Sequence, residues 1–244
     1  MKRSTIVAAV ALLCLVATSR VTAQQSQANQ FTVVPFEFDP FNTFLVAAEW
    51  KTGIGCPTGA QTTADGMTFT PYNDPACVTG DPQDKRNEGL LLAKTGPTAN
   101  FASAGAKING VTGMVITELG YDIRKPGTEL SVGPRGSHCG AGAPRFNITT
   151  RDGTTYFIGC NSPPAVQQPG QGWVRLRWGG AVPLLAFPAA GGAPVDISTL
   201  EVVRLEIDFD EGQDTLPDNF GAAVLDNIDV NGVLVGRGPR SRVE

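Results

Sequence analysis

The densest group of side chains that could do chemistry is acidic and lies near residue 210. Alternation along a strand puts Glu206, Asp208 and Asp210 on one face, with about 7 Å between successive positions. Two carboxylates about 5–10 Å apart are the pair that a glycoside hydrolase uses. Acids on the outward face of an antiparallel strand are also an ordinary solvated arrangement, and we favour that interpretation.

The turn that follows these acids offers a further interpretation, a structural calcium site. Calcium prefers several hard oxygen ligands in a flexible array. Asp210, Asp214 and Asp218 are spaced along this turn, and Asp226 lies in the next strand-like segment. The spacing does not match an EF-hand loop. If the domain holds calcium, we expect these four aspartates to be ligands.

Residues 173–178 alternate tryptophan and arginine with apolar residues. Sugar rings stack on exposed aromatic faces, so Trp173 is a candidate stacking residue. Arg175 and Arg177 share its face and could donate hydrogen bonds to hydroxyls or carboxylates. The competing interpretation is that the aromatic residues belong to the core and the arginines are surface charges. The aromatic residues considered are Trp50, Trp173, Trp178, Tyr72, Tyr121 and Tyr156.

His138 is the single histidine of the chain, so a hydrolytic triad or a histidine metal site has one candidate at most. Ser137 and Cys139 adjoin it in sequence, which is poor geometry for a triad. The order of residues 136–140 also does not give a Gly-x-Ser-x-Gly motif. We therefore predict no catalytic residue here.

Four cysteines follow residue 23, and an even number in an exported chain favours disulfides. Of the three pairings we predict the two local ones, Cys56 with Cys77 and Cys139 with Cys160. Each closes a loop of about 20 residues, worth about 3 kcal/mol in the chain-entropy model. The spacing does not fit a zinc site, because no two cysteines are close in sequence.

The first 23 residues have the layout of a secretory signal peptide. A basic head precedes an apolar run over residues 6–18, and small residues precede a cut after Ala23. That run is shorter than the roughly 20 residues that span a bilayer, and no later segment approaches this length. We expect a secreted chain, periplasmic or extracellular, without a membrane span after cleavage.

Charge narrows the choice of partners. Removal of residues 1–23 takes away Lys2, Arg3 and Arg20 and no acid, so the formal charge falls from −4 to −7. A net-acidic chain repels phosphate backbones, so we expect no nucleic-acid partner.

Strand patterns and turn residues dominate the remaining sequence. The chain has 29 glycines and 18 prolines, and helical periodicity never exceeds about two turns. Many short strands separated by turns are typical of sandwiches and barrels. We predict an all-β protein, an antiparallel β-sandwich of jelly-roll type with long disulfide-tied loops. Residues 24–30 would be a disordered lead, 31–236 a single domain and 237–244 a tail.

Several segments carry predictions of register. Pro35 interrupts the first strand-like run and predicts an edge strand or a bulge. Asp152-Gly153 and Asn231-Gly232 predict two-residue hairpin turns, the first pairing Ile148 with Phe157. The clean alternation over residues 200–209 predicts one buried face made of Val203, Leu205, Ile207 and Phe209.

The stretch AVLDNIDVNG at residues 223–232 resembles the closing strand of galactose-binding-like jelly rolls, a fold that many carbohydrate-binding modules of glycosidases share. Phe36-Glu37-Phe38 is similar to the Phe-Glu that opens such domains. Residues 136–147 and 210–214 resemble exported bacterial proteins. The resemblance implies a structural calcium near the chain ends, but a fold by itself does not give a function.

Three functions are consistent with these observations. The leading hypothesis is an extracellular, non-catalytic binding module for a glycan or cell-wall polymer. A structural or adhesive surface protein that contacts another protein is the alternative, and a contiguous exposed apolar area would favour it. A glycoside hydrolase or lyase would need two carboxylates facing each other across a groove. The sequence does not indicate the oligomeric state.

Overall fold

The computed structural model describes residues 31–57, 63–64, 67–68, 73–95, 101–125, 143–164, 166–210 and 220–240 of the 244-residue chain. The predicted signal peptide and the predicted lead over residues 24–30 lie outside the described residues. Within these ranges, no helix has the length and apolarity needed to cross a bilayer.

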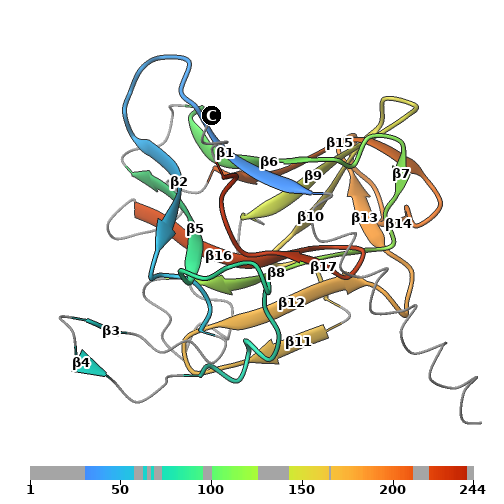
Figure 1. Cartoon of the computed structure of the whole chain (residues 1–244). Coiled ribbons are helices and arrows are strands. Elements are labelled where there is room, and N and C mark those ends of the chain that lie inside the picture. The colour runs from blue at the N-terminus through green and yellow to red at the C-terminus, as the bar shows by residue number, and fades with distance from the viewer. Residues whose placement is uncertain are drawn as a thin grey trace, which may run out of the picture.

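The described strands form two antiparallel sheets that face each other (Figure 1). Sheet A contains, in spatial order, β1 (Thr32–Phe38), β6 (Ser103–Asn109), β15 (Glu201–Phe209), β9 (Arg145–Thr150), β10 (Thr155–Gly159), β13 (Leu185–Pro188) and β14 (Val195–Asp196), with β7 (Met114–Val115) beside β15. Sheet B contains β11 (Val166–Pro169), β12 (Val174–Gly179), β8 (Glu118–Arg124), β16 (Phe220–Val230), β5 (Glu88–Thr95) and β2 (Val46–Thr52), with β17 (Val233–Val235) beside β16. A separate short pair consists of β3 (Thr63–Ala64) and β4 (Met67–Thr68).

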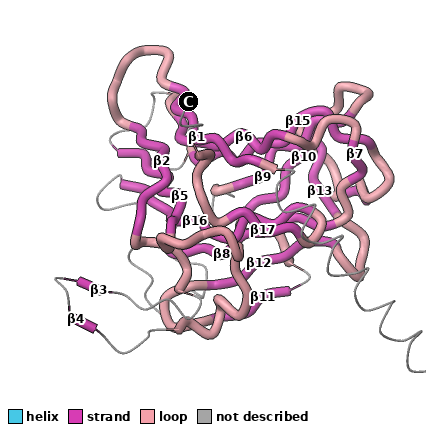
Figure 2. The backbone as a smooth tube through the Cα atoms, viewed as in Figure 1, coloured by secondary structure: helices cyan, strands magenta, loops and turns pink. Residues whose placement is uncertain are grey.

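The chain passes repeatedly from one sheet to the other. It runs from β1 in sheet A to β2 and β5 in sheet B, returns to β6, crosses to β8, and continues in this way to β15 and β16. Figure 2 shows these strands joined by loops, with no helix in the described part of the chain. The predicted all-β sandwich of jelly-roll type is confirmed.

The facing surfaces of the two sheets enclose the core. Tyr121, Phe146 and Trp178 meet at its centre, with ring centroids 5.3–6.2 Å apart. The Tyr121 hydroxyl donates a hydrogen bond of 2.9 Å to the Pro144 carbonyl, which satisfies its polar group inside the core. Trp178 therefore belongs to the core and not to a binding surface.

The edge strands β1 and β2 of the two sheets lie on the same side of the sandwich and contact each other. Pro35 is tolerated in β1 because an edge strand has one side without a ladder partner, as predicted. The Trp50 indole N–H of β2 donates to the Val33 carbonyl of β1 at 3.0 Å. This bond joins the two sheets at their open edge.

The two predicted hairpin turns have different outcomes. Val230 pairs with Val233 across Asn231-Gly232, both of which adopt positive φ, so that two-residue turn is confirmed. The Asp152-Gly153 hairpin is shifted by one residue, and Ile148 pairs with Tyr156 instead of Phe157. The Asp152 carboxylate accepts the Thr150 hydroxyl and the Thr154 N–H, which stabilises a longer turn.

One predicted buried residue of β15 is exposed. The register between β15 and β9 shifts between Val202 and Arg204, which is the signature of a bulge. Val202 is consequently buried and Val203 is exposed, whereas Leu205, Ile207 and Phe209 are buried as predicted.

Candidate functional site

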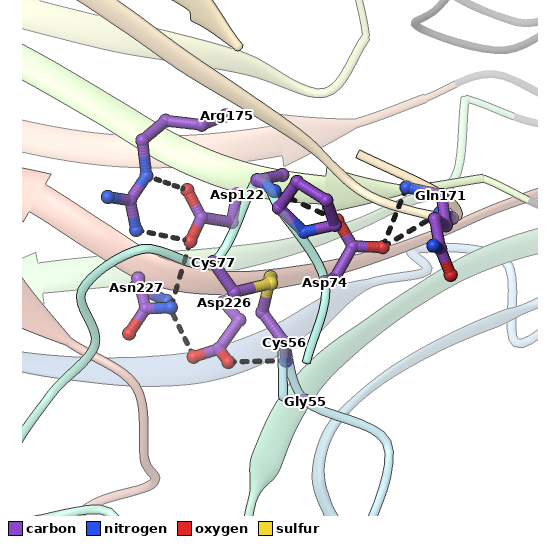
Figure 3. Close-up of a disulfide and its surroundings, with 12 residues drawn as sticks. Gly55, Cys56, Asp74, Cys77, Asp122, Gln171, Arg175, Asp226 and Asn227 are labelled. Atoms are coloured by element: carbon purple, nitrogen blue, oxygen red, sulfur yellow. Dashed lines mark hydrogen bonds and ion pairs between the residues drawn. A yellow bond between two sulfur atoms is a disulfide. The ribbon is translucent and has the colours of Figure 1, made fainter. Parts of the chain in front are cut away.

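A long excursion of the chain covers the outer face of sheet B. Residues 53–57 and 73–87 of this excursion are called here the covering segment. The predicted disulfide between Cys56 and Cys77 is confirmed, with a Cα–Cα distance of 5.8 Å. Figure 3 shows this disulfide between the covering segment and the polar residues of sheet B. Trp173 packs in one buried cluster with the two cysteines. The covering segment therefore seals a face of the sheet that would otherwise be open to solvent.

Asp74 attaches the covering segment to the turn between β11 and β12. Its Oδ2 accepts the backbone N–H groups of Gln171 at 3.0 Å and Gly172 at 2.8 Å. Its Oδ1 accepts the N–H of Ala76 at 2.9 Å. The approach is so close that a Cβ at Gly170 would lie 1.5 Å from Asp74 Oδ1. Glycine at position 170 is thus required by packing.

Beneath the covering segment lies a buried ion pair between Arg175 and Asp122. The guanidinium donates from Nε and Nη2 to the two carboxylate oxygens, each at 2.8 Å. The same guanidinium donates to the Thr79 hydroxyl at 2.8 Å and also to the Thr79 carbonyl. Arg175 therefore links the covering segment to sheet B. The Cys56 and Cys77 sulfurs lie within 4.8 Å of the Asp122 carboxylate, but sulfurs joined in a disulfide are not thiolate ligands for a metal.

Arg177 lies flat across β8 beside this pair. Its Nε contacts Asp229 Oδ2 at 2.8 Å, and its Nη2 contacts Asp122 Oδ1 at 3.3 Å. A Cβ at Gly120 would lie 2.3 Å from Arg177 Cδ, so the side chain occupies the space left by that glycine. Burial raises the pKa of Asp229, and the Arg177 cation opposes this shift.

Asp226 and Asn227 complete the buried network on β16. Asp226 Oδ2 accepts the Cys56 N–H at 2.7 Å, and Oδ1 accepts the Asn227 N–H at 2.6 Å. The Asn227 side-chain amide donates to Asp122 at 2.9 Å. Burial raises the pKa of the Asp226 carboxyl well above its ordinary value, although both backbone hydrogen bonds oppose the shift.

The structure brings the three predicted ligand-binding residues together, but on a closed face. Trp173 is 2% exposed, and Arg175 and Arg177 are each 6% exposed. The covering segment and its disulfide occupy this face, so the three side chains are buried in the structure, and their role in ligand binding stays a prediction. Strand alternation identifies residues on one face of a strand but does not show whether a distant loop covers that face.

Two of the four aspartates predicted as calcium ligands are described. Asp210 accepts both terminal nitrogens of Arg145, at 2.8 and 2.9 Å, and Asp226 accepts two backbone N–H groups. Protein donors therefore engage both carboxylates in this arrangement. Asp214 and Asp218 lie outside the described residues, so a calcium site stays a prediction.

The acids of β15 also bind a cation of the protein itself. Arg145 donates to Asp208 at 2.8 Å as well as to Asp210, so one guanidinium bridges two of the three acids. Burial raises the pKa of Asp208, and the charge of Arg145 opposes this shift. These carboxylates follow one another along a single strand and do not face each other across a groove.

The second predicted disulfide is described at one of its two cysteines. Cys160 is buried and disulfide-bonded, whereas Cys139 lies outside the described residues. His138 also lies outside them.

An open cleft of about 700 Å³ lies beside the edge strands, where the covering segment meets the end of the described chain. It is lined by Pro35, Glu49, Trp50, Gln83, Lys85, Arg86, Glu88, Arg237, Gly238, Pro239 and Arg240. The sequence pointed to Trp50 only as one aromatic among six. Residues 237–240, predicted as part of a tail, form one wall of this cleft.

Hydrogen bonds fix the walls of the cleft. Glu88 Oε2 accepts the Gly238 N–H at 3.0 Å, and Glu88 Oε1 accepts Arg86 at 2.5–2.8 Å. A Cβ at Gly238 would lie 3.0 Å from Trp50 Cδ1, so the backbone of that glycine packs against the indole. The indole N–H of Trp50 donates a hydrogen bond to the Val33 carbonyl, which fixes the orientation of the ring. Trp50 is thus held in a fixed position while it remains partly exposed.

The fold places the chain in the class of antiparallel jelly-roll β-sandwiches. No known family model and no curated protein matches it.

Three solved structures are similar in fold. The family 11 carbohydrate-binding module of the cellulosomal cellulase Lic26A-Cel5E of Clostridium thermocellum has 11% identity and a TM-score of 0.39, with 86% of this chain and 90% of that chain covered. A second structure of the Clostridium thermocellum module, in complex with a beta-1,3-1,4-mixed-linked tetrasaccharide, has 11% identity and a TM-score of 0.39, with 83% and 90% covered. A beta-1,2-glucanase from Parabacteroides distasonis has 14% identity and a TM-score of 0.31, with 77% of this chain and 23% of that chain covered.

Proposed function

We propose that the chain is an extracellular, non-catalytic binding module that holds a glycan in the cleft beside Trp50. The observation that supports this most is the meeting of a partly exposed indole with several hydrogen-bonding side chains in one open concavity. A sugar ring presents apolar C–H faces edged by hydroxyls, so its site needs an aromatic surface beside polar groups. The predicted signal peptide and the disulfides support an extracytoplasmic setting.

The carboxylates of the cleft support a non-catalytic role. Both Glu88 oxygens accept hydrogen bonds from the protein, one from Arg86 and one from the Gly238 N–H. Glu49 forms an ion pair with Lys51 at 2.8 Å. Glycoside hydrolysis needs two carboxyl groups, one acid and one base or nucleophile. Of the two carboxylates that line this cleft, Glu88 is buried and only Glu49 is exposed.

A binding screen tests the proposal. Residues 24–244, with disulfides intact, are passed over soluble and insoluble polysaccharides, once with calcium and once with a chelator. We expect at least one polysaccharide class to be retained, and we expect Trp50→Ala to weaken retention about tenfold, equivalent to about 1.4 kcal/mol. Phe41→Ala, which removes an exposed aromatic ring elsewhere, is the control and should bind as the parent does. Thermal unfolding of each variant verifies that it is folded.

The outcomes of the screen are distinct. No retention of the folded parent protein by any polysaccharide, with or without calcium, would contradict a glycan-binding role. Retention of Trp50→Ala equal to that of the parent protein would show that the glycan does not bind in this cleft. Retention in calcium that is lost in the chelator would show that binding depends on a calcium ion.

A protein-contact role is the second candidate, because four phenylalanines are exposed at one end of the sandwich. Phe41 and Phe44 lie on the loop between β1 and β2, and are 68% and 88% exposed. Phe38 pairs with Ser103, which places Phe101 beside the same loop. Large exposed apolar areas commonly mark contact surfaces. Figure 1 shows this loop projecting from the sandwich.

The phenylalanine loop is held in shape by Asp39. Its carboxylate accepts the Phe44 N–H at 2.7 Å and the Thr43 hydroxyl at 2.9 Å, and Phe44 adopts a φ of 57°. A non-glycine residue in this region costs free energy. Sedimentation velocity over a range of concentrations tests for self-association through this loop. Association that is abolished by Phe41→Ser with Phe44→Ser would support it, and a monomer at all concentrations would contradict it.

A further inference from the structure

The charged residues of the cleft are unevenly paired. Arg86 is paired with Glu88, Arg237 lies 3.5 Å from Asp81, and Glu49 is paired with Lys51. These three pairs account for every charged lining residue except two. The two that remain are both cationic, Lys85 and Arg240.

Lys85 and Arg240 have backbone carbonyls as their partners. Lys85 Nζ donates to the Pro82 carbonyl at 2.7 Å, and Arg240 Nη2 donates to the Gln83 carbonyl at 3.4 Å. Within the described part of the chain neither forms an ion pair. Both are exposed, and both are anchored to the same turn, so their charges converge on one side of the cleft.

These cations keep hydrogen-bonding capacity for a ligand. An ammonium has three N–H donors and a guanidinium has five, and one donor of each is used by a carbonyl. Carboxylates are among the anionic acceptors that an exposed ammonium and guanidinium bind with charge-assisted hydrogen bonds. Arg86 adds a third cation, because its side chain remains 67% exposed in its ion pair.

The charge of the cleft is opposite to that of the chain. The lining residues include four cations and two acids, whereas the chain as a whole carries a formal charge of −4. A negatively charged polymer is repelled by most of such a surface and attracted at the cleft. Trp50 lies in the same cleft, which favours a ligand made of sugar rings over a simple polyanion.

We infer that the cleft binds an anionic glycan, a polymer whose sugars carry carboxylates, through Lys85 and Arg240 beside the Trp50 ring. This inference rests on the proposed function, since it names the class of glycan. Binding then depends on a carboxylate that reaches the two cations while a neighbouring sugar ring packs on the indole.

Affinity electrophoresis tests the inference in native gels that contain polygalacturonate, neutral hydroxyethylcellulose or poly-glutamate. We expect residues 24–244 to be retarded most by polygalacturonate, and less as salt is added, because ions screen exposed charges. Lys85→Gln with Arg240→Gln should lose at least about tenfold in affinity for polygalacturonate. The matched control removes one lysine and one arginine from the outer face of sheet A, Lys107→Gln with Arg204→Gln, and should bind as the parent does.

The outcomes distinguish failure of the anionic-glycan inference from failure of the proposed glycan-binding function. Equal binding of the neutral and acidic glycans, or full binding by the cleft double variant, would overturn the inference and leave a glycan-binding module. Poly-glutamate bound as tightly as polygalacturonate would overturn the need for sugar rings. A folded parent protein that binds neither glycan here, nor any polysaccharide of the wider screen, would overturn the proposed function itself.

Discussion

The buried carboxylate of Asp226 accepts the backbone N–H of Cys56 at 2.7 Å, although the two residues are 170 positions apart in the chain. This bond connects the centre of sheet B to the start of the covering segment, next to the disulfide. The outer face of sheet B is consequently an interior, and the polar residues on it serve the fold. The open polar concavity lies instead at the edge of the sandwich, beside Trp50.

The disulfide should contribute strongly to stability, because it closes the covering segment over polar groups. Replacement by Cys56→Ser with Cys77→Ser removes a cross-link between residues 21 positions apart. We expect the free energy of unfolding to fall by about 3 kcal/mol. Urea unfolding of parent and variant at one pH measures this difference. A fall of less than about 1 kcal/mol would mean that the noncovalent contacts alone hold the segment.

Stability should decrease as the pH rises from about 4 through the native pKa values of four buried or half-buried acids. Burial raises the pKa values of Asp226, Asp229, Asp208 and Glu118. Such acids stabilise the fold most below their unfolded pKa of about 4, and this contribution is lost as the pH rises through the native pKa. The exposed acids with lowered pKa act in the opposite sense, but mainly below about pH 4.

The urea midpoint measured at several pH values tests this pH dependence. Asp226→Asn carries an amide that does not titrate, so its midpoint should vary less with pH than that of the parent, whatever its absolute stability. A parent midpoint that rises from pH 5 to pH 8 would contradict the assigned direction of these shifts.

Arg175→Leu should be among the most destabilising single substitutions. It leaves the buried Asp122 carboxylate without its bidentate partner, and removal of one member of a buried pair costs about 3–5 kcal/mol. Arg204→Leu is the matched control, because that arginine is largely exposed and 3.9 Å from Glu206, and it should cost less than about 0.5 kcal/mol. Similar unfolding free energies for the two variants would show that the buried pair contributes no more than a surface pair.

Gly120→Ala should destabilise the protein through one added methyl group. That Cβ would lie 2.3 Å from Arg177 Cδ and 2.5 Å from the Leu176 carbonyl oxygen, so the arginine must leave its place against Asp229. We expect a cost of about 1–3 kcal/mol, typical of overpacking. Thermal unfolding of both variants measures this cost. At Gly172 an added Cβ meets nothing within 4 Å, so Gly172→Ala should be nearly neutral. A neutral Gly120→Ala would mean that Arg177 does not need this position.

The sequence was sufficient to predict features that depend on local chemistry. Asn231-Gly232 forms a two-residue turn because both residues tolerate positive φ, and Pro35 marks an edge strand because it lacks a donor. Asp152-Gly153 carries a similar signal, but the Asp152 carboxylate binds its neighbours and shifts the register by one residue.

Features that depend on distant contacts could not be predicted in this way. The bulge that exposes Val203 arises from pairing between β15 and β9. The burial of Arg175 depends on a segment about 100 positions earlier in the chain, which alternation within β12 does not reveal. The cleft combines parts of four separate segments, so no single motif contains its lining residues.

The most direct test of a glycan site in this cleft is NMR of the ¹⁵N-labelled parent protein, residues 24–244. Its three tryptophans give three indole N–H signals, and the loss of one signal in Trp50→Phe assigns Trp50. Oligogalacturonate and a neutral cello-oligosaccharide are titrated in separate samples. We predict that the Trp50 signal shifts together with amides of residues 83–88 and 237–240, while the buried Trp173 and Trp178 do not move. A Trp50 signal unmoved by either sugar, or shifts confined to Trp173 and its surroundings, would contradict the account.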